Sequence, residues 1–446
     1  MKKVITYGTY DLLHEGHIRL LKRAKDLGDY LIVGITSDDF DKTRGKINVQ
    51  QPLMERLEAV RETGLADKII VEEYIGQKID DIKRYDVDIF TVGSDWEGQF
   101  DYLKEYCDVV YLPRTEGVSS SELRAESRQV RLGIVSSGKP NVIKKYYKEA
   151  GYVNGLDVTA ICSDDLLSFD FLNNKSIVLT NDYNSILDHC DAVYICSEPR
   201  LHYDQIKKAL EKGKHIICES PMCVSKEQCE EVLSLAKEKG LVLADAMKTA
   251  YSTAYNRLLL LVKSGRIGKV VSVETTCTSL IEDIETKYKG WNSIETWGPL
   301  ALLPVFQILG VDYKDMNMVS YNMPGRDNFD LFTKMDFVYS GAVASAKVGL
   351  GVKSEGELVI SGTKGYAYVP APWWKTEYFE IRYENSNENK RYYYDLAGEG
   401  IRYELVAFAK MIEKAGHSNF YVPEEVSMAI SDVMDRFFTG DRVEIG

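Results

Sequence analysis

Two histidines near the start of the chain are the residues whose types and spacing most directly suggest chemistry. His14 and His17 lie three positions apart, with Gly16 between them. They follow the strand-like segment 4–7 and open the segment 17–27, whose apolar residues recur on one helical face. At the start of a helix, two imidazoles are joined by free backbone N–H groups and by the positive end of the helix dipole. This combination suits a transition state in which phosphorus is anionic and five-coordinate.

A second polar loop supports this interpretation. A single histidine at a helix start is more often a cap or a core residue than a catalyst, and that alternative applies to each of the two. However, the run RTEGVSSS from Arg114 to Ser121 follows the apolar segment 108–112 and precedes helix-forming residues. An arginine, a glycine and three hydroxyls before a helix can hold a polyphosphate, although serine-rich helix caps are common. We expect both loops at the carboxyl edge of one parallel sheet, where open α/β sheets bind ligands.

The rest of the chain supplies the elements that must position these residues. Strand-like and helix-like segments alternate as far as residue 112, which predicts a doubly wound parallel sheet. After the polar, charged stretch 119–131 a new apolar strand begins at Leu132, and the alternation repeats until a meander of strands follows residue 250. The chain is therefore predicted to be an α/β protein with domains at 1–128, 129–249 and 250–446.

Composition limits the function classes that fit the chain. Its 446 residues include 68 acidic and 55 basic ones, and the net charge of −13 argues against a general nucleic-acid or anionic-membrane binder. The eight cysteines show no CxxC spacing, which favours reduced thiols over a disulfide framework or a zinc site. No apolar stretch is long enough to predict a bilayer-spanning helix, and no signal-peptide pattern is present. We expect a cytoplasmic protein without membrane insertion.

Residues 1 to about 127 resemble the glycerol-3-phosphate cytidylyltransferase family, within the nucleotidyltransferases that carry an HxGH motif. The resemblance is carried by the runs at 7–17, 93–98, 110–113 and 114–121. It implies that the phosphate of an alditol phosphate, such as glycerol 3-phosphate, attacks the α-phosphorus of CTP, giving a CDP-alditol and pyrophosphate with the help of Mg²⁺. It also implies a homo-oligomer and a pathway to a cell-envelope polymer, such as a teichoic acid or a capsule.

The resemblance assigns roles to individual residues. His14 and His17 would stabilise the five-coordinate phosphorus, with Lys46 and Arg114 as further catalytic residues. Arg56 would help to bind the phosphate of the acceptor. The nucleotide would be bound by Gly8, Thr9, Tyr10, Gly16, Gly93, Ser94, Asp95, Trp96, Thr115, Ser119, Ser120 and Ser121.

Two positions depart from the pattern of this family. Ser94 stands where an acidic residue is frequent, which leaves open the side chain that accepts from the amino group of cytosine. Ser120 and Ser121 stand where the family commonly shows a hydroxyl pair with threonine, a change that keeps the chemistry.

A second constellation follows the predicted domain boundary. The run GIVSSGKPN at 133–141 occupies the position of a dinucleotide-binding turn. Ser136 and Asn141 stand where the first and third glycines of a GxGxxG pattern would be, so that only Gly138 is left. The run SDD at 163–165, after the next predicted strand, could offer an acidic group to a ribose.

Later segments resemble the glucose–fructose oxidoreductase/inositol dehydrogenase family, and this resemblance covers residues 130–446. Its strongest segments are the runs at 194–202, 213–221 and 265–270. It implies a second Rossmann-like domain, after the Rossmann-like HxGH nucleotidyltransferase domain, and then an α+β domain with an open-faced antiparallel sheet. It also implies NAD(H) or NADP(H) as cofactor, with binding residues Ser136, Gly138, Ser197 and Glu219.

The catalytic groups of that second family are not matched. Its EKP triplet supplies a lysine beside the nicotinamide, whereas this chain has Ser220. Where an Asp and a His are common after a GGGAL-like stretch, the run GPLAL at 298–302 leads to Pro304 and Ile308, and neither can donate a proton. Three residues could substitute, although surface or core roles are more usual for them: Lys248, Tyr251 and Tyr255.

Three functions are therefore compatible with the sequence. The first is a cytidylyltransferase whose second half is non-catalytic or binds a nucleotide weakly, and serves in dimerisation or docking. The second is a bifunctional enzyme that reduces a keto-phosphate with NAD(P)H and then activates the resulting alditol phosphate with CTP. The third is a nucleotide-binding scaffold in which neither half turns over.

Overall fold

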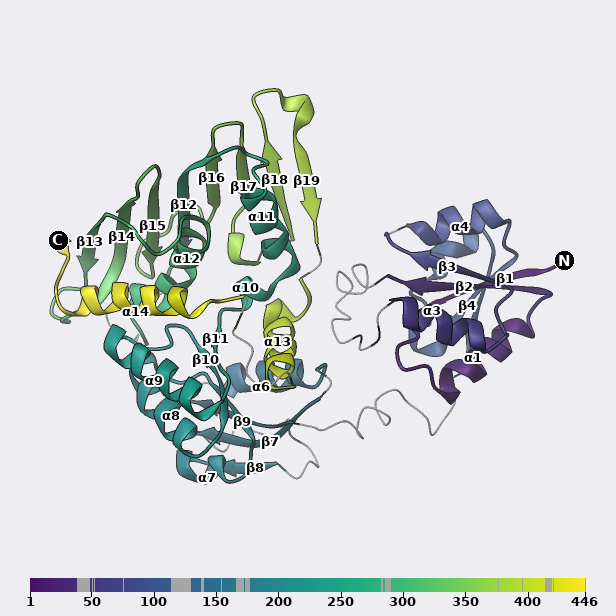
Figure 1. Cartoon of the computed structure of the whole chain (residues 1–446), viewed down its shortest axis with the longest axis horizontal. Helices are drawn as coiled ribbons and strands as arrows, with labels where there is room; N and C mark the ends of the chain where they lie inside the picture. Colours follow the sequence, from purple (N-terminus) through teal and green to yellow (C-terminus); the bar gives the residue numbers. More distant parts are fainter. Residues whose placement is uncertain are drawn as a thin grey trace. The chain divides into compact units, whose positions relative to one another are not determined.

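The chain forms two compact units, Met1–Gln129 and Val130–Gly446, and each is described by itself (Figure 1). The computed structural model describes residues 1–37, 49, 51, 53–74, 76–113, 130–137, 140–153, 155–165, 172, 177–281, 284, 290–375, 377–394, 396–413, 419 and 421–445.

The first unit is built around a five-stranded sheet with the order β3-β2-β1-β4-β5, in which all neighbours are parallel. Its strands are β1 (Lys3–Gly8), β2 (Tyr30–Thr36), β3 (Lys68–Glu72), β4 (Ile89–Gly93) and β5 (Asp108–Leu112). The connections contain α1 (Glu15–Lys25), α3 (Leu53–Glu62), α4 (Gln77–Tyr85) and the short 3₁₀ helices η1 (Ser94–Trp96) and η2 (Asp101–Glu105). The predicted doubly wound sheet is confirmed.

Two apolar layers hold this sheet in place. On β1, Val4 packs in a layer with Leu21 of α1 and Val60 of α3. The neighbouring Ile5 packs on the other face with Ile82 of α4, because successive side chains of a strand point to opposite faces. The parallel arrangement brings the carboxyl ends of the strands to one edge, which is where the first candidate site lies.

The second unit begins with a six-stranded parallel sheet of order β11-β10-β9-β6-β7-β8. Its strands are β6 (Val130–Ser136), β7 (Leu156–Ser163), β8 (Val178–Thr180), β9 (Ala192–Ile195), β10 (His215–Glu219) and β11 (Leu243–Ala246). Its helices are α6 (Pro140–Ala150), α7 (Tyr183–Leu187), α8 (Pro199–Glu211) and α9 (Lys226–Lys239). Strand order and parallel pairing match the predicted Rossmann-like domain.

A nine-stranded sheet of order β19-β18-β17-β16-β12-β15-β14-β13-β20 completes the second unit. Its strands are β12 (Val270–Thr278), β13 (Asp315–Asn322), β14 (Asp330–Val338), β15 (Val343–Gly349), β16 (Leu358–Gly362), β17 (Tyr366–Val369), β18 (Tyr378–Arg382), β19 (Lys390–Tyr393) and β20 (Val443–Ile445). The pairs β12·β15 and β13·β20 are parallel, and the other pairs are antiparallel as predicted.

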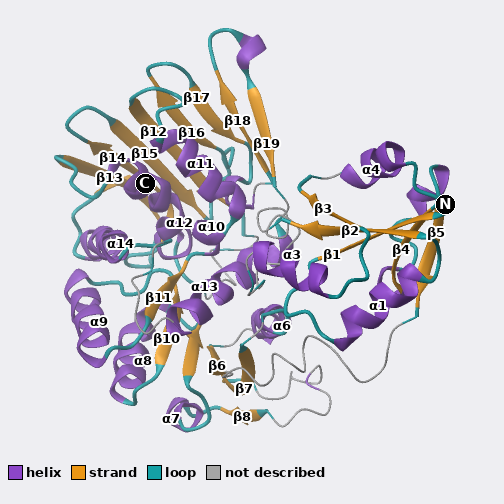
Figure 2. Ribbon diagram, turned by 45° about the vertical axis from the view of Figure 1, so that its right-hand side comes forward, coloured by secondary structure: helices purple, strands orange, loops and turns teal. Residues whose placement is uncertain are grey.

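The second unit contains further helices, and several of them lie between its two sheets (Figure 2). They are α10 (Lys248–Tyr251), α11 (Thr253–Lys263), α12 (Ser293–Leu309), α13 (Ile401–Glu413) and α14 (Glu424–Phe438), with the 3₁₀ helices η4 (Trp373–Lys375), η5 (Ser386–Glu388) and η6 (Ala397–Gly400). Helix α12 packs on β12, β14 and β15, and α14 contacts both α12 and α9. The larger sheet is therefore linked to the parallel sheet through α14.

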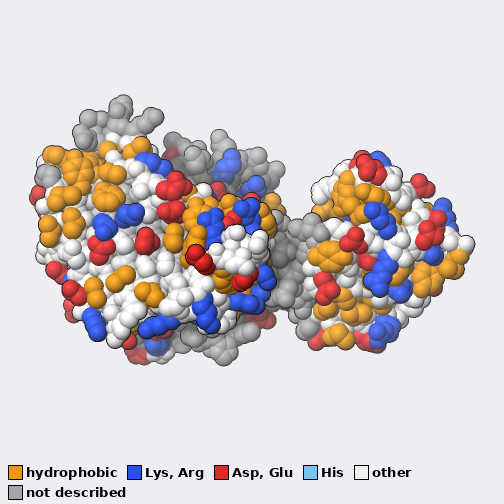
Figure 3. Space-filling view, turned by 90° about the horizontal axis from the view of Figure 1, so that it is seen from above, with side chains coloured by type: hydrophobic (Ala, Val, Ile, Leu, Met, Phe, Trp, Pro, Cys, Tyr) orange, Lys and Arg blue, Asp and Glu red, His pale blue; other side chains and the backbone are white. Residues whose placement is uncertain are grey.

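The surface carries charges of both signs. On the face shown in Figure 3, acidic and basic side chains are interspersed over each unit. Within the described ranges, no helix combines the length and the apolar character that crossing a bilayer requires.

Candidate functional site

The turn between β1 and α1 brings the two predicted histidines together. His14 is the N-cap of α1, and its Nδ1 accepts a hydrogen bond from the backbone N–H of Gly16 at 3.1 Å. The rings of His14 and His17 stack with centroids 3.9 Å apart and planes inclined by 23°. Because Nδ1 of His14 is an acceptor, a neutral ring carries its proton on Nε2. The turn therefore presents a fixed imidazole pair at the positive end of α1.

The backbone before this pair is held in an uncommon conformation. Tyr10 and Leu12 have φ angles of 51° and 48°, in the left-handed region that L-residues rarely adopt. The ring of Tyr10 folds back over the end of β1, where a Cβ on Gly8 would lie 2.9 Å from it. On its other side the ring meets His17 edge-on, with centroids 5.5 Å apart. Gly8 thus permits the turn that places His17, and its predicted contact with phosphate stays a prediction.

Arg56 ties this turn to the neighbouring strand. The residue is fully buried in α3. Its Nη1 donates to the carbonyl oxygens of Thr9 at 2.7 Å and Thr36 at 3.0 Å, and its Nε donates to that of Gln51 at 3.0 Å. Three backbone segments converge on one guanidinium. These contacts show Arg56 as a brace of the loop, and its predicted contact with the acceptor phosphate stays a prediction.

Gln51 provides a second brace that sequence reasoning did not find. Its side-chain oxygen accepts from the backbone N–H of Leu12 at 2.8 Å, and its own N–H donates to Oδ1 of the buried Asp11 at 2.9 Å. The two bonds fix the loop in which Leu12 takes its positive φ. No motif marks such a pair, because the partners are about 40 residues apart in the chain and neither type is diagnostic.

The predicted base pocket lies at the end of the adjacent strand. Gly93 ends β4, which pairs with β1, and Ser94 and Trp96 follow in η1. The indole of Trp96 is half-buried and packs against Phe100, with ring centroids 5.9 Å apart. The structure describes the backbone of Asp95 but not its side chain. The predicted site residues outside the described part of the chain are Lys46, Arg114, Thr115, Ser119, Ser120 and Ser121.

A buried ionic cluster lies at the end of β3 and was not predicted. The ammonium group of Lys78 forms an ion pair with Glu72, and both side chains are buried. Lys78 also lies over the ring of Tyr7, 4.6 Å from its centroid, and the hydroxyl of Tyr7 donates to Asp81 at 2.9 Å. Burial and the neighbouring carboxylate raise the pKa of Tyr7 above its ordinary value. The cluster anchors α4 to the ends of β1 and β3.

The dinucleotide-binding residues predicted in the second unit lie at the carboxyl edge of its parallel sheet. Ser136 ends β6 and is 4% exposed, and its hydroxyl has no hydrogen-bond partner among the described residues. Ser197 follows β9, and its hydroxyl donates to Gln205. Gly138 lies outside the described residues. A buried hydroxyl that lacks a partner at the end of the first strand fits a bound dinucleotide, which offers acceptor oxygens there.

Glu219 takes part in a buried network of acids and tyrosines. Its Oε1 accepts from the hydroxyls of Tyr146 and Tyr194, the latter at 3.3 Å. The hydroxyl of Tyr194 also donates to Glu404 at 2.7 Å. Burial, followed by the charge of Glu219, raises the pKa of Glu404 well above its ordinary value. The side chain of Glu219 is thus engaged within the protein, and its predicted contact with a cofactor stays a prediction.

The structure places Ser220, which replaces the expected lysine, beside an acid. The hydroxyl of Ser220 donates to Asp245, whose other oxygen accepts from Ser427 at 2.8 Å. Helix α12 carries no ionisable side chain after Glu295, and Pro304 is buried in it. The family's proton-donating groups therefore have no counterpart on this helix.

Three residues were considered as substitutes for the missing catalytic groups, and two of them, Tyr251 and Tyr255, are hydrogen-bonded to other residues in the core. The hydroxyl of Tyr251 donates to the backbone oxygen of Asp245 at 2.8 Å and accepts from Asn419 at 2.7 Å. That of Tyr255 donates to Gln307 at 2.8 Å. Both tyrosines are buried, whereas Lys248 is half-buried at the start of α10. Of the three, Lys248 is the one that the core does not enclose.

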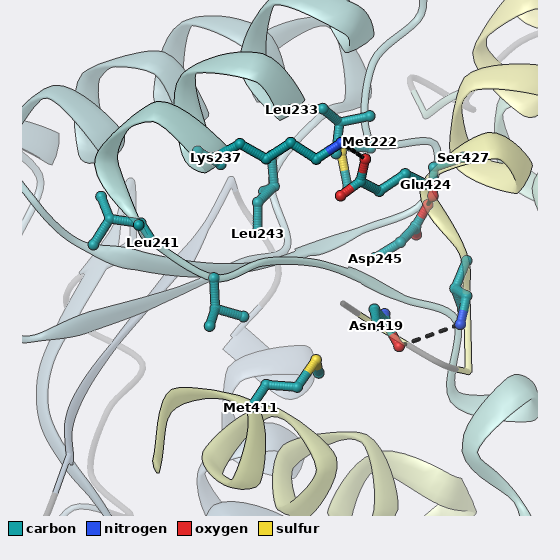
Figure 4. A pocket seen from close by; sticks show the side chains of 14 residues that line it. Met222, Leu233, Lys237, Leu241, Leu243, Asp245, Met411, Asn419, Glu424 and Ser427 are labelled. Carbon is teal, nitrogen blue, oxygen red and sulfur yellow. Dashed lines mark hydrogen bonds and ion pairs between the residues drawn. The ribbon is translucent and has the colours of Figure 1, made fainter. Parts of the chain in front are cut away.

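Asp245 also lines a cavity of about 250 Å³ (Figure 4). The walls combine apolar side chains, including Leu233 and Met411, with polar ones, including Lys237 and Glu424, which form an ion pair. Burial raises the pKa of Asp245 to about 6, although the hydroxyls of its serine partners oppose the shift. An acid within the apolar run LADA at 243–246 is the sequence signal that could have marked this position.

We expect Arg56→Ala to loosen the first unit. The substitution removes the donor from three carbonyl oxygens, of which those of Thr9 and Thr36 take part in buried hydrogen bonds, and this loss should cost about 2–4 kcal/mol. Hydrogen–deuterium exchange of the amides in β1 and β2 measures this effect. Arg61→Ala is the matched control, because Arg61 lies in the same helix with its side chain 65% exposed. Equal exchange in the two variants would contradict the brace.

We expect Asp245→Asn to change how stability depends on pH. An acid whose pKa is raised in the folded state, here from 3.8 to about 6, makes folding less favourable as pH rises through that interval. Relative to the natural chain, the variant should therefore gain up to about 3 kcal/mol of unfolding free energy between pH 4 and pH 7.5.

Urea unfolding of both proteins at several pH values between 4 and 7.5 measures this difference. Asp204→Asn, an exposed acid in α8, is the control and should shift with pH far less. A parallel pH dependence for Asp245→Asn and the natural chain would show that Asp245 does not carry the raised pKa.

Comparison with known proteins bears on both units. A family model described as cytidylyltransferase-like matches residues 5–126, and one described as an oxidoreductase family with an NAD-binding Rossmann fold matches residues 131–246. A scyllo-inositol 2-dehydrogenase (NADP⁺) of Bacillus subtilis is 41% identical over 133 residues, which are 29% of this chain and 40% of that protein. The chain thus spans less than half the length of this relative.

Solved structures extend the likeness of the second unit. A 3-ketoreductase from Actinomadura kijaniata, in complex with TDP-benzene and NADP, matches with a TM-score of 0.62 at 18% identity, covering 71% of this chain and 99% of that one. At this identity the match shows the fold. Both resemblances expected from the sequence are confirmed.

The first unit has a nearer relative. A glycerol-3-phosphate cytidylyltransferase of Staphylococcus aureus is 50% identical over 130 residues, which are 28% of this chain and 95% of that protein. Identity at this level over almost the whole relative places the chain, through its first unit, in the glycerol-3-phosphate cytidylyltransferase family of nucleotidyltransferases.

Proposed function

We propose that the first unit transfers the cytidylyl group of CTP to the phosphate of an alditol phosphate. An oxygen of the acceptor phosphate attacks the α-phosphorus, and the bond from that phosphorus to the bridging oxygen of the β-phosphate breaks. The bonding electrons leave with pyrophosphate, and a CDP-alditol forms. Because an ionised phosphate is the nucleophile, the reaction needs charge stabilisation and alignment rather than a strong base.

The observation that carries this proposal is the stacked imidazole pair at the start of α1. The rings of His14 and His17 lie 3.9 Å apart at the carboxyl edge of the sheet. Their N–H groups can donate to the non-bridging oxygens of the α-phosphate, where negative charge grows in the transition state. The bonds that Arg56 and Gln51 make to the preceding loop support a preorganised site.

The acceptor is proposed by similarity. Glycerol 3-phosphate is the first candidate, because relatives of this unit carry that compound in their names. The described residues contain no group of three His, Cys, Asp or Glu side chains that could hold a metal, and Mg²⁺ is proposed to enter with the triphosphate. A cytoplasmic homo-oligomer that feeds cell-envelope polymer synthesis completes the proposal on the same basis.

The second unit is proposed to bind a nicotinamide dinucleotide without the hydride-transfer groups of its relatives. The match to an NAD-binding family model and the buried hydroxyl of Ser136 support binding. Ser220 in place of the lysine, together with the uncharged length of α12 after Glu295, argues against the bifunctional reductase. The proposal therefore combines a working transferase with an attached binding module.

Pyrophosphate release from CTP tests the transferase. The full-length chain should release pyrophosphate only when Mg²⁺ and an alditol phosphate are both present, and a panel of phosphorylated polyols should identify the acceptor. If no alditol phosphate supports release, the proposed function is wrong and the scaffold alternative is favoured.

We expect His14→Ala and His17→Ala to lower kcat by about 10²–10⁴, the usual effect of losing a group that stabilises transition-state charge. Steady-state pyrophosphate release measures kcat. His189→Ala is the matched control, since His189 is an exposed histidine of the second unit, and its activity should equal that of the natural chain. Activity within a few-fold of normal in either of the first two variants would remove that histidine from the mechanism.

A further inference from the structure

The cavity that Asp245 lines has a polar side and an apolar side. Its volume of about 250 Å³ is room for a small organic molecule. Lys237 and Gly240, which line it at the end of α9, are exposed, so the cavity can be entered there. In Figure 4, Asp245 and Glu424 lie on one side of the cavity and Leu241 lies on the other. A ligand that matches both sides must therefore be amphipathic.

The apolar side is built from several elements. It includes Leu233 of α9, Met411 of α13 and Val422, which precedes α14, and all three side chains are buried. Such a surface stabilises a hydrocarbon body by burying it. It does not suit a bare metal ion such as Ca²⁺, which takes about six or more oxygen ligands. The apolar side therefore favours an organic ligand over an inorganic ion.

The charged side chains of the wall leave one negative charge in excess. Among the described residues that line the cavity, Lys237, Asp245 and Glu424 are the charged ones, so two carboxylates face one ammonium group. Lys237 forms an ion pair with Glu424. Asp245 is only 1% exposed, and a buried charge needs a counter-charge or a full set of hydrogen bonds. A ligand with one positive charge would balance the wall.

The carboxyl group of Asp245 has acceptor capacity left for such a ligand. One of its oxygens accepts from the hydroxyl of Ser220, and the other accepts from that of Ser427 at 2.8 Å. A carboxylate offers about four acceptor positions, so these two serines occupy about half of them. Both donors are neutral hydroxyls, whereas an ammonium group would form a charge-assisted and stronger hydrogen bond.

We propose that this cavity binds a small organic ammonium ion, whose N–H groups donate to Asp245 and whose hydrocarbon body packs against the apolar side. An organic anion is disfavoured by the excess negative charge of the wall, and a neutral molecule leaves that charge unbalanced. The inference goes beyond cytidylyl transfer and dinucleotide binding and depends on neither of them.

Titration of the full-length protein with n-butylammonium at pH 7.5 tests the proposal, with binding followed by ligand-observed NMR. Two probes of similar size separate charge from apolar contact: n-butanol is neutral, and butyrate is an anion. We expect saturable binding of n-butylammonium, binding of n-butanol at least about tenfold weaker, and no binding of butyrate. The tenfold scale is that of one charge-assisted hydrogen bond.

Variants of the wall test the role of Asp245. Asp245→Asn, expected above to be the more stable chain near neutral pH, should weaken n-butylammonium binding at least about tenfold and change n-butanol binding little. Asp204→Asn is the matched control, because it makes the same change at an exposed position in α8, and it should leave both affinities unaltered.

Lys237→Met should act in the opposite direction. It removes the positive charge from the wall and keeps an unbranched side chain, so n-butylammonium should bind several-fold more tightly. A general loss of structure would not strengthen binding. Four results would overturn the inference: no saturable binding of n-butylammonium, equal affinity in Asp245→Asn and the natural chain, binding of butyrate as tight as that of n-butylammonium, or weaker binding in Lys237→Met.

Discussion

The guanidinium of Arg56 is the interaction on which the candidate transfer site depends. It is buried without exposure to solvent and donates to backbone oxygens of Thr9, Thr36 and Gln51. Removing a charged group from water is costly, and directed hydrogen bonds are what make it tolerable. These three hydrogen bonds offset the cost of burying the charge. Because they go to backbone oxygens rather than to side chains, they also fix the path of the loop that leads to His14.

Both units carry their candidate nucleotide site at the carboxyl edge of a parallel sheet, and the side chains at the two edges differ in charge. In the first unit, the edge presents the imidazoles of His14 and His17 at the positive end of a helix. In the second, Asp164 and Asp182 stand at the ends of β7 and β8. A transferase must stabilise negative charge on phosphate, which suits imidazoles at a helix start, whereas carboxylates at a strand end accept hydrogen bonds. The topology of the sheet determines where a nucleotide site lies, and the side chains at the strand ends determine the sign of the charge in that site.

Local sequence patterns predicted the parts of the molecule that depend on neighbouring residues. The histidine pair was predicted because three positions along the start of a helix bring two side chains to one end. The alternation of strands and helices predicted both parallel sheets, since βαβ units leave little choice of topology. Helix α1 begins at Glu15 rather than at residue 17, because His14 itself supplies the cap, and His17 therefore lies within its first turn.

Contacts between distant residues were not predictable in the same way. Arg56 was noticed only through the family resemblance, and nothing local indicated that it would bind the carbonyls of Thr9 and Thr36. The bond from Ser220 to Asp245 joins residues 25 positions apart. The bonds of Arg56 and the bond of Ser220 both depend on which strands become neighbours in a sheet. The sequence of a single strand does not determine which residues will lie beside its end. The parallel pairing of β12 with β15 within a largely antiparallel sheet was missed for the same reason.

The net charge of −13 does not by itself prevent the binding of an anionic nucleotide at these sites. A protein of this charge repels polyanions at long range, but salt screens such repulsion beyond about 10 Å. Binding of a triphosphate is therefore decided within the site, by groups close enough to act unscreened. In the transferase proposed for the first unit, the described groups of this kind are His14, His17 and the start of α1, all on one short turn.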